Sequence, residues 1–184
     1  MFVVNVSGGF ANQLFKFACA YQLSQEFHQE MILQIYNKNC YVDAFLLDEL
    51  NIGNFRRIYT RTECEVEKIA EWFGKSEILR IDEHNYNVLN EKLFTDDVLV
   101  YVNAPFQKPM YFDKYLDDIR NMFQLRWMSK EMKDFKLLLT NQNTVAIHVR
   151  RRDFVDIRNV YGYMQISYNF YKAAVVYFRK NTNN

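Results

Sequence analysis

Residues 148–153, with the sequence His-Val-Arg-Arg-Arg-Asp, bring together side chains that could bind an anion. Burying the guanidinium of Arg150 or Arg151 without an anion would cost several kcal/mol, whereas a charge-assisted hydrogen bond to phosphate contributes about 1.5–3 kcal/mol. A diphosphate is therefore the ligand that this strip favours, with His148 beside it.

The apolar run that precedes this strip, residues 144–149, predicts a strand. Alternation along it places His148 and Arg150 on one face near the carboxyl end, where ligands bind in open α/β sheets. The alternative is a solvated turn in which Arg151 and Arg152 face water and Asp153 pairs with one of them, while His148 is a core histidine. For Arg152 we prefer that alternative.

A second group of residues suited to binding is Gly8-Gly9-Phe10-Ala11-Asn12-Gln13, which follows the apolar run 2–6 and opens an apolar-rich helix. Gly8 and Gly9 allow the backbone to approach a ligand, the helix N-terminus favours phosphate or sugar hydroxyls, and Asn12 and Gln13 add amide donors and acceptors. An ordinary strand-to-helix turn with Asn12 as a helix cap is about equally compatible with this spacing. The third glycine of a dinucleotide-binding fingerprint is absent.

Strands and helices alternate along the whole chain, which predicts an α/β fold with a Rossmann-like parallel sheet and helices. Thr62 with Glu65 has the spacing of a capping box, Gly74 is a plausible helix end, and Ser129 is a candidate N-cap. The apolar patterns predict strands at 2–6, 31–35, 98–102 and 144–149, and helices at 12–27, 62–73, from 108 onward, 129–139 and after about 165.

Composition describes an ordinary folded chain with no global electrostatic field. The 184 residues are 49% hydrophobic and carry a formal net charge of +1, so charge balance favours neither a nucleic-acid nor a membrane-surface partner. The three cysteines have no metal-binding spacing, which favours buried or free thiols and a reducing compartment. Without a signal-peptide pattern or a membrane-spanning apolar run, we expect a cytoplasmic protein with no stable membrane insertion.

Together the two motifs resemble those of α-1,2-fucosyltransferases of glycosyltransferase family 11. That family opens with a Gly-Gly-x-Gly-Asn-Gln motif, which residues 8–13 match except for Ala11, and continues to a His-x-Arg-Arg-Gly-Asp-(Tyr/Phe) signature, which residues 148–154 match except for Arg152. If position 11 requires a positive φ, an alanine there is strained. Weaker correspondences are Phe106-Gln107 followed by Tyr111-Phe112, and residues 167–174.

The resemblance implies a two-Rossmann (GT-B) glycosyltransferase that transfers fucose from GDP-fucose to the 2-hydroxyl of a galactose-containing acceptor glycan, with inversion and without a metal ion or other cofactor. It implies that Arg150 grips the diphosphate, with His148 and Arg151 in support, while Gly8, Gly9, Asn12 and Gln13 bind substrate. We assign transition-state stabilisation to Arg150. Asp153 is a candidate general base, although it could equally fasten the loop by pairing with an arginine.

The resemblance covers nearly all of the chain but stops before the later part of the family's sequence. We therefore predict an N-terminal Rossmann-like, acceptor-side domain at 1–141 and an incomplete start of the donor-binding domain at 142–184, since about forty residues are too few for a second Rossmann unit. The main hypothesis is a truncated fucosyltransferase with weak or absent transfer. The alternatives are a non-catalytic nucleotide-sugar or glycan-binding protein and, least favoured, an RNA-binding protein.

Overall fold

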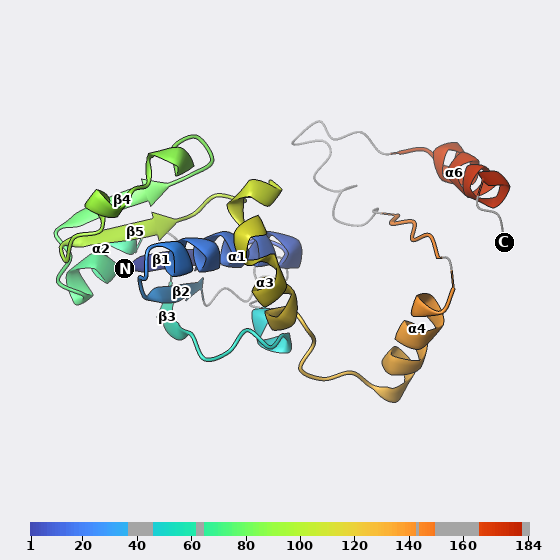
Figure 1. Cartoon of the computed structure of the whole chain (residues 1–184), viewed down its shortest axis with the longest axis horizontal. Coiled ribbons are helices and arrows are strands. Elements are labelled where there is room, and N and C mark those ends of the chain that lie inside the picture. The colour runs from blue at the N-terminus through green and yellow to red at the C-terminus, as the bar shows by residue number, and fades with distance from the viewer. Residues whose placement is uncertain (37–45, 62–64, 143, 150–165, 182–184) are drawn as a thin grey trace. The chain divides into compact units, whose positions relative to one another are not determined.

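The computed structural model describes residues 1–36, 46–61, 65–142, 144–149 and 166–181 (Figure 1). The chain forms two compact units, Met1–Trp127 and Met128–Asn184. The predicted domain boundary lies at residue 141, so the units differ from the predicted domains in the segment that carries the helix after Ser129. The acceptor-side and donor-side roles of the two parts remain predictions.

The first unit is built on a five-stranded, entirely parallel sheet with the order β3-β2-β1-β5-β4. This arrangement confirms the predicted α/β, Rossmann-like class. The strands are β1 (Phe2–Val6), β2 (Met31–Tyr36), β3 (Arg56–Thr60), β4 (Glu77–Ile81) and β5 (Val98–Val102).

Both faces of the central strands are covered, because successive side chains of a strand point to opposite faces. Phe2, Val4 and Val6 of β1 face the core formed with helix α1 (Phe10–Glu26). Val3 faces a smaller core formed with helix α2 (Val66–Trp72) on the other side. The sheet is therefore the middle layer of three, with α1 along one face (Figure 1).

The ends of α2 show how local sequence sets helix boundaries. The helix begins at Val66 after the N-cap Glu65, later than the predicted start at Thr62, which lies outside the described residues. It ends at Trp72, and the predicted terminating glycine, Gly74, follows the C-cap Phe73. The φ of +62° at Gly74 allows the Lys75 N–H to bond the Ala70 carbonyl at 2.8 Å.

The segment after β5 is less helical than its apolar pattern predicted. Helix α3 spans Leu116–Met122, and two 3-10 turns, Pro109–Tyr111 and Asp113–Tyr115, precede it. Pro109 lacks the N–H that a longer helix would need. The described part of the first unit also contains 3-10 turns at Leu47–Glu49, Tyr86–Val88 and Glu91–Leu93.

The second unit contains helices α4 (Lys130–Thr140) and α6 (Tyr168–Asn181). The predicted cap of α4 is confirmed, since the Ser129 hydroxyl oxygen accepts the Met132 N–H at 3.2 Å. The predicted strand at 144–149 is not formed: these residues have no strand pairing and are all exposed. A strand needs a neighbour to satisfy its backbone groups, and the described part of this unit offers none.

Candidate functional site

The carboxyl ends of β1 and β5 meet where the strand order of the sheet reverses. From β1 the chain proceeds through α1 to β2 on one side, whereas β5 lies against β1 on the other side. In open α/β sheets a ligand crevice forms at this switch point, outside the carboxyl ends of the strands. The predicted glycine motif lies there, directly after β1.

Glycine at position 8 is required by the turn that joins β1 to α1. Gly8 has a φ of +83°, and a Cβ built on it would lie 3.4 Å from Nδ2 of Asn12. Gly9 is the N-cap of α1 with φ −60° and ψ 160°, so the cap is not Asn12. Ala11 lies in the first turn of the helix and is not among the described non-glycine residues with positive φ, so alanine is not strained there.

Two pairs of amide side chains connect the ends of β1 and β5. Nε2 of Gln107 donates to Oδ1 of Asn12 at 3.1 Å, and Nδ2 of Asn5 donates to Oδ1 of Asn103 at 2.5 Å. Asn5 is fully buried, Asn12 is half-buried, and Asn103 and Gln107 are exposed. We call these four residues the amide cluster. Its uncharged donors and acceptors suit the hydroxyl groups of a sugar.

The buried Gln13 side chain holds the glycine turn through hydrogen bonds to backbone. Its side chain is fully buried, its Nε2 donates to the Gly8 carbonyl at 2.8 Å, and its Oε1 accepts the Leu46 N–H at 3.1 Å. Both ends of the amide therefore hold backbone, so any effect of Gln13 on a ligand would act through the shape of the turn. Its predicted role in substrate binding stays a prediction.

Lys16 is a buried basic residue next to the same turn, and it was not predicted as a site residue from the sequence. Its Nζ donates to the Ser7 hydroxyl at 2.9 Å, and the residue is 7% exposed. Lysine is seldom this buried unless it is paired. A single lysine between Phe15 and Phe17 of an apolar helix was the available sequence signal.

Gln107 reaches Asn12 from a strained stretch of backbone. Phe106 precedes it with a φ of +51°, which is unusual for a bulky residue, and its ring is fully buried against Tyr86 and Tyr111. The Phe106 N–H donates to Oε1 of Glu83 at 3.1 Å. Packing and this charge-assisted bond hold the left-handed conformation that turns the chain toward α1.

Cys19 is fully buried and Tyr86 is half-buried on the α1 side of the sheet, and both side chains are held neutral. Burial, followed by the charges of Glu26 and Glu83, raises the pKa of the Cys19 thiol well above its ordinary value of 9.0. Burial also raises the pKa of Tyr86, whose hydroxyl accepts a hydrogen bond from Nε2 of Gln22 at 3.1 Å. The predicted buried thiol is confirmed for Cys19.

The predicted binding residues fall into two sets. Gly8, Gly9, Asn12 and Gln13 come together in the first unit, whereas His148 is exposed in the second unit. Arg150, Arg151 and Asp153 lie outside the described residues. Across the described ranges there is no group of three His, Cys, Asp or Glu residues placed to hold a metal ion. No helix in that part of the chain has the length and apolar character needed to cross a membrane.

The sequence is similar to that of an alpha-1,2-colitosyltransferase from Escherichia coli. The two are 21% identical over 195 aligned residues, which cover 99% of this chain and 65% of the relative. The chain thus spans just under two thirds of the length of that protein, and the similarity extends along both units. No protein-family model and no solved structure matches the chain.

Proposed function

We propose that this chain is part of a glycosyltransferase that transfers fucose, or a closely related deoxy sugar, from a GDP-linked donor to the 2-hydroxyl of a galactoside, with inversion. The observation that carries the proposal is the amide cluster at the switch point of a parallel sheet, in a chain whose whole length is similar to a transferase of α-1,2-linked colitose. Colitose is 3-deoxyfucose, so the two sugars present nearly the same shape to a binding site.

The chemistry of the first unit suits an acceptor glycan. The amide cluster offers both donors and acceptors. Its exposed members, Asn103 and Gln107, can exchange their hydrogen bonds to Asn5 and Asn12 for hydrogen bonds to sugar hydroxyls. Gly8 and Gly9 keep side chains away from the adjoining backbone, so a sugar ring can approach the first turn of α1. We assign acceptor binding to this region.

Donor binding is assigned to the arginine strip on the strength of its sequence motif. In an inverting transfer the acceptor hydroxyl attacks the anomeric carbon in line, its proton passes to a base, and the diphosphate leaves with the bonding electrons. Arg150 would stabilise the charge that develops on that diphosphate, with His148 and Arg151 in support. Asp153 is the candidate base, and the two-domain GT-B arrangement, the cytoplasmic location and independence of metal ions belong to the same proposal.

A direct assay tests the proposal. The full chain is incubated with GDP-fucose or GDP-colitose and a β-galactoside, and GDP release and the disaccharide are measured with and without EDTA. We expect weak transfer that EDTA does not change and that Arg150→Ala abolishes. Asn12→Ala should raise the acceptor KM about tenfold, because a site built to bond a hydroxyl loses that bond, while Gln25→Ala on the exposed side of the same helix leaves it unchanged.

Two outcomes would overturn the assignment. If neither donor is turned over, but GDP binds calorimetrically and Arg150→Ala removes that binding, the chain is a non-catalytic nucleotide-sugar-binding protein. If GDP does not bind and oligonucleotides bind with a strong salt dependence, the arginine strip serves nucleic acid instead.

A further inference from the structure

Glu83 connects the loop after β4 to the loop after β5 through a hydrogen bond to the backbone. Its half-buried carboxylate accepts the Phe106 N–H on Oε1 at 3.1 Å. Phe106 has a φ of +51°, in the left-handed region that is unfavourable for a bulky residue. A hydrogen bond to an ionised group is shorter and stronger than one between neutral groups. The carboxylate thus acts on a residue whose conformation needs support.

The chain is anchored on both sides of Phe106. On the upstream side, β5 is paired with β1 and with β4. On the downstream side, the side chain of Gln22 on α1 is 1% exposed and holds the backbone twice: its Oε1 accepts the Lys114 N–H at 3.1 Å, and its Nε2 donates to the Met110 carbonyl at 3.3 Å. The turn at Phe106 therefore bridges two segments that are fixed to the rest of the unit.

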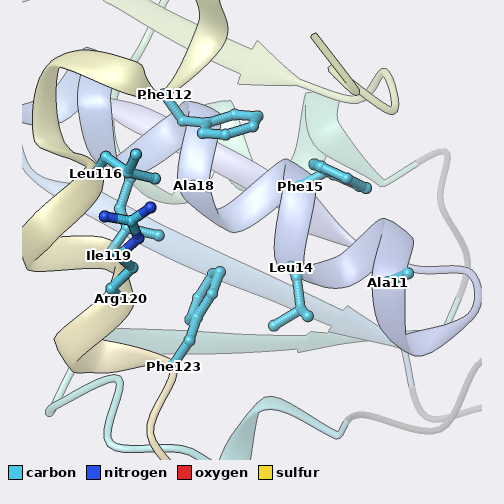
Figure 2. A pocket seen from close by; sticks show the side chains of 9 residues that line it. All are labelled: Ala11, Leu14, Phe15, Ala18, Phe112, Leu116, Ile119, Arg120 and Phe123. Atoms are coloured by element: carbon cyan, nitrogen blue, oxygen red, sulfur yellow. The ribbon is translucent and has the colours of Figure 1, made fainter. Parts of the chain in front are cut away.

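Aromatic contacts fix the side chains on this segment as well. The ring of Phe112 lies beside that of Phe15 on α1, with centroids 5.8 Å apart, and both rings line an apolar pocket between α1 and α3 (Figure 2). The Phe106 ring is fully buried, and its centroid lies 6.1 Å from that of Tyr86 and 5.2 Å from that of Tyr111. Since the ring and both flanking segments are held, the backbone torsion at Phe106 decides where the next residue points.

That next residue is Gln107, a member of the amide cluster. Its Nε2 donates to Oδ1 of Asn12 at 3.1 Å, but its side chain is exposed, so packing does not hold it there. A rotation about the N–Cα bond of Phe106 would re-aim the peptide that leads to Gln107. The position of Gln107 beside Asn12 therefore depends on the turn that Glu83 supports.

We propose that Glu83 is a positioning residue of the acceptor site. By accepting the Phe106 N–H, it holds the left-handed turn that presents Gln107 to the acceptor beside Asn12. The inference rests on the proposed function, because the amide cluster must bind the acceptor. It extends the acceptor site to a carboxylate on the loop after β4, outside both of the sequence motifs.

Nuclear magnetic resonance tests the geometry without a ligand. The side-chain amide signal of Gln107, identified by its loss in Gln107→Ala, is recorded in the full chain and in its variants. We expect Glu83→Ala to shift this signal as Asn12→Ala does, because both changes remove the bond of the Gln107 amide. Glu91→Ala, which alters an exposed carboxylate in the same unit, should leave the signal in place. An unmoved Gln107 signal in Glu83→Ala overturns the proposal.

Binding of methyl β-galactoside, measured by calorimetry without a donor, tests the consequence for the acceptor. We expect Glu83→Ala to raise the acceptor Kd by about threefold to tenfold, as Gln107→Ala does, because each loses about one hydrogen bond to the sugar. The double variant should bind no more weakly than Gln107→Ala alone, since Glu83 acts through Gln107. Additive losses would mean that Glu83 acts elsewhere, and would overturn the proposal.

Two conservative variants separate the hydrogen bond from the charge, and they serve if Glu83→Ala does not fold. Glu83→Gln keeps an acceptor oxygen at the same reach, so it should retain most of the acceptor affinity and the Gln107 signal. Glu83→Asp keeps the charge but is one methylene shorter, so it should resemble Glu83→Ala. The reverse order would show that the charge itself acts on the acceptor, and the positioning role would fall.

Failure of the two proposals can be told apart. If the chain transfers fucose to a galactoside and Glu83→Ala leaves the acceptor KM unchanged, the transferase function stands and the positioning role falls. If Glu83→Ala shifts the Gln107 signal, but the unaltered chain neither binds the galactoside nor transfers fucose, Glu83 holds the turn while the proposed function falls, and the acceptor role of Glu83 falls with it.

Discussion

Replacing Gln13 with alanine tests the claim that this side chain holds the glycine turn. The substitution removes the amide that accepts the Leu46 N–H and donates to the Gly8 carbonyl, at 3.1 and 2.8 Å. The Leu46 N–H and the Gly8 carbonyl then lose their hydrogen bonds to the Gln13 side chain. We therefore expect a loss of stability, and a change in any bound acceptor only through the shape of the turn.

The size of the loss follows from the two bonds. An unsatisfied buried polar group costs about 1–3 kcal/mol, and the lower half of that range applies because both bonds are only partly buried. For two groups the free energy of unfolding should fall by about 2–4 kcal/mol. At about 4 °C per kcal/mol, the midpoint of thermal unfolding should fall by about 8–16 °C.

Thermal and urea unfolding, followed by circular dichroism, measure this change. Gln25→Ala is the matched control, because Gln25 lies on the same helix but is exposed, and it should change the free energy of unfolding by less than about 0.5 kcal/mol. If Gln13→Ala is no more destabilising than Gln25→Ala, Gln13 does not hold the turn. An intact stability with a lost acceptor affinity would instead assign Gln13 directly to the ligand.

Three further predictions concern the same end of the sheet and the core behind it. Gly8→Ala should cost about 1–2 kcal/mol because of its φ of +83°, while Gly9→Ala, with open space around its Cβ, should cost less than 1 kcal/mol; equal costs in urea unfolding would refute the turn geometry. A double-mutant cycle of Asn12→Ala and Gln107→Ala should give a coupling of about 0.5–1 kcal/mol, and additivity would mean that their hydrogen bond contributes nothing. Burial raises the pKa of Cys19, so a variant with the other two cysteines changed to serine should react slowly with a thiol reagent at about pH 8 until it is unfolded. The free energy of unfolding that the neutral Cys19 thiol contributes should fall as the pH rises above the pKa of the thiol in the unfolded chain. Fast labelling of the native protein would contradict this burial.

The central strands could be predicted from the sequence and the edge strands could not. In β1 and β5 every residue is buried, so the apolar runs were unmistakable. β3 and β4 lie at the edges of the sheet, and their exposed positions carry charged residues such as Arg56 and Glu77. Charges protect an edge from further pairing, and for the same reason they hide a strand from a search for apolar residues.

The candidate site shows a similar division between local and distant information. The spacing of Gly8 to Gln13 was sufficient to place a turn and a helix start, since both depend on neighbouring residues. Nothing in the sequence indicated that Gln107 would bond to Asn12, 95 residues away, or that Asn103 would bond to Asn5. Those contacts depend on β5 being placed beside β1, which is a property of the whole sheet.

The two strand ends that meet at the site both turn through left-handed backbone, but by different means. Gly8 adopts a φ of +83° without a side chain to oppose it, whereas Phe106 adopts +51° with a full aromatic ring. Such a conformation persists when the surroundings determine it, here through burial of the ring and the carboxylate of Glu83 on its N–H. The left-handed residue Phe106 directly precedes Gln107, which donates to Asn12 in the amide cluster. The family resemblance drew attention to position 11 as the strained one, yet the strain lies at the end of the neighbouring strand.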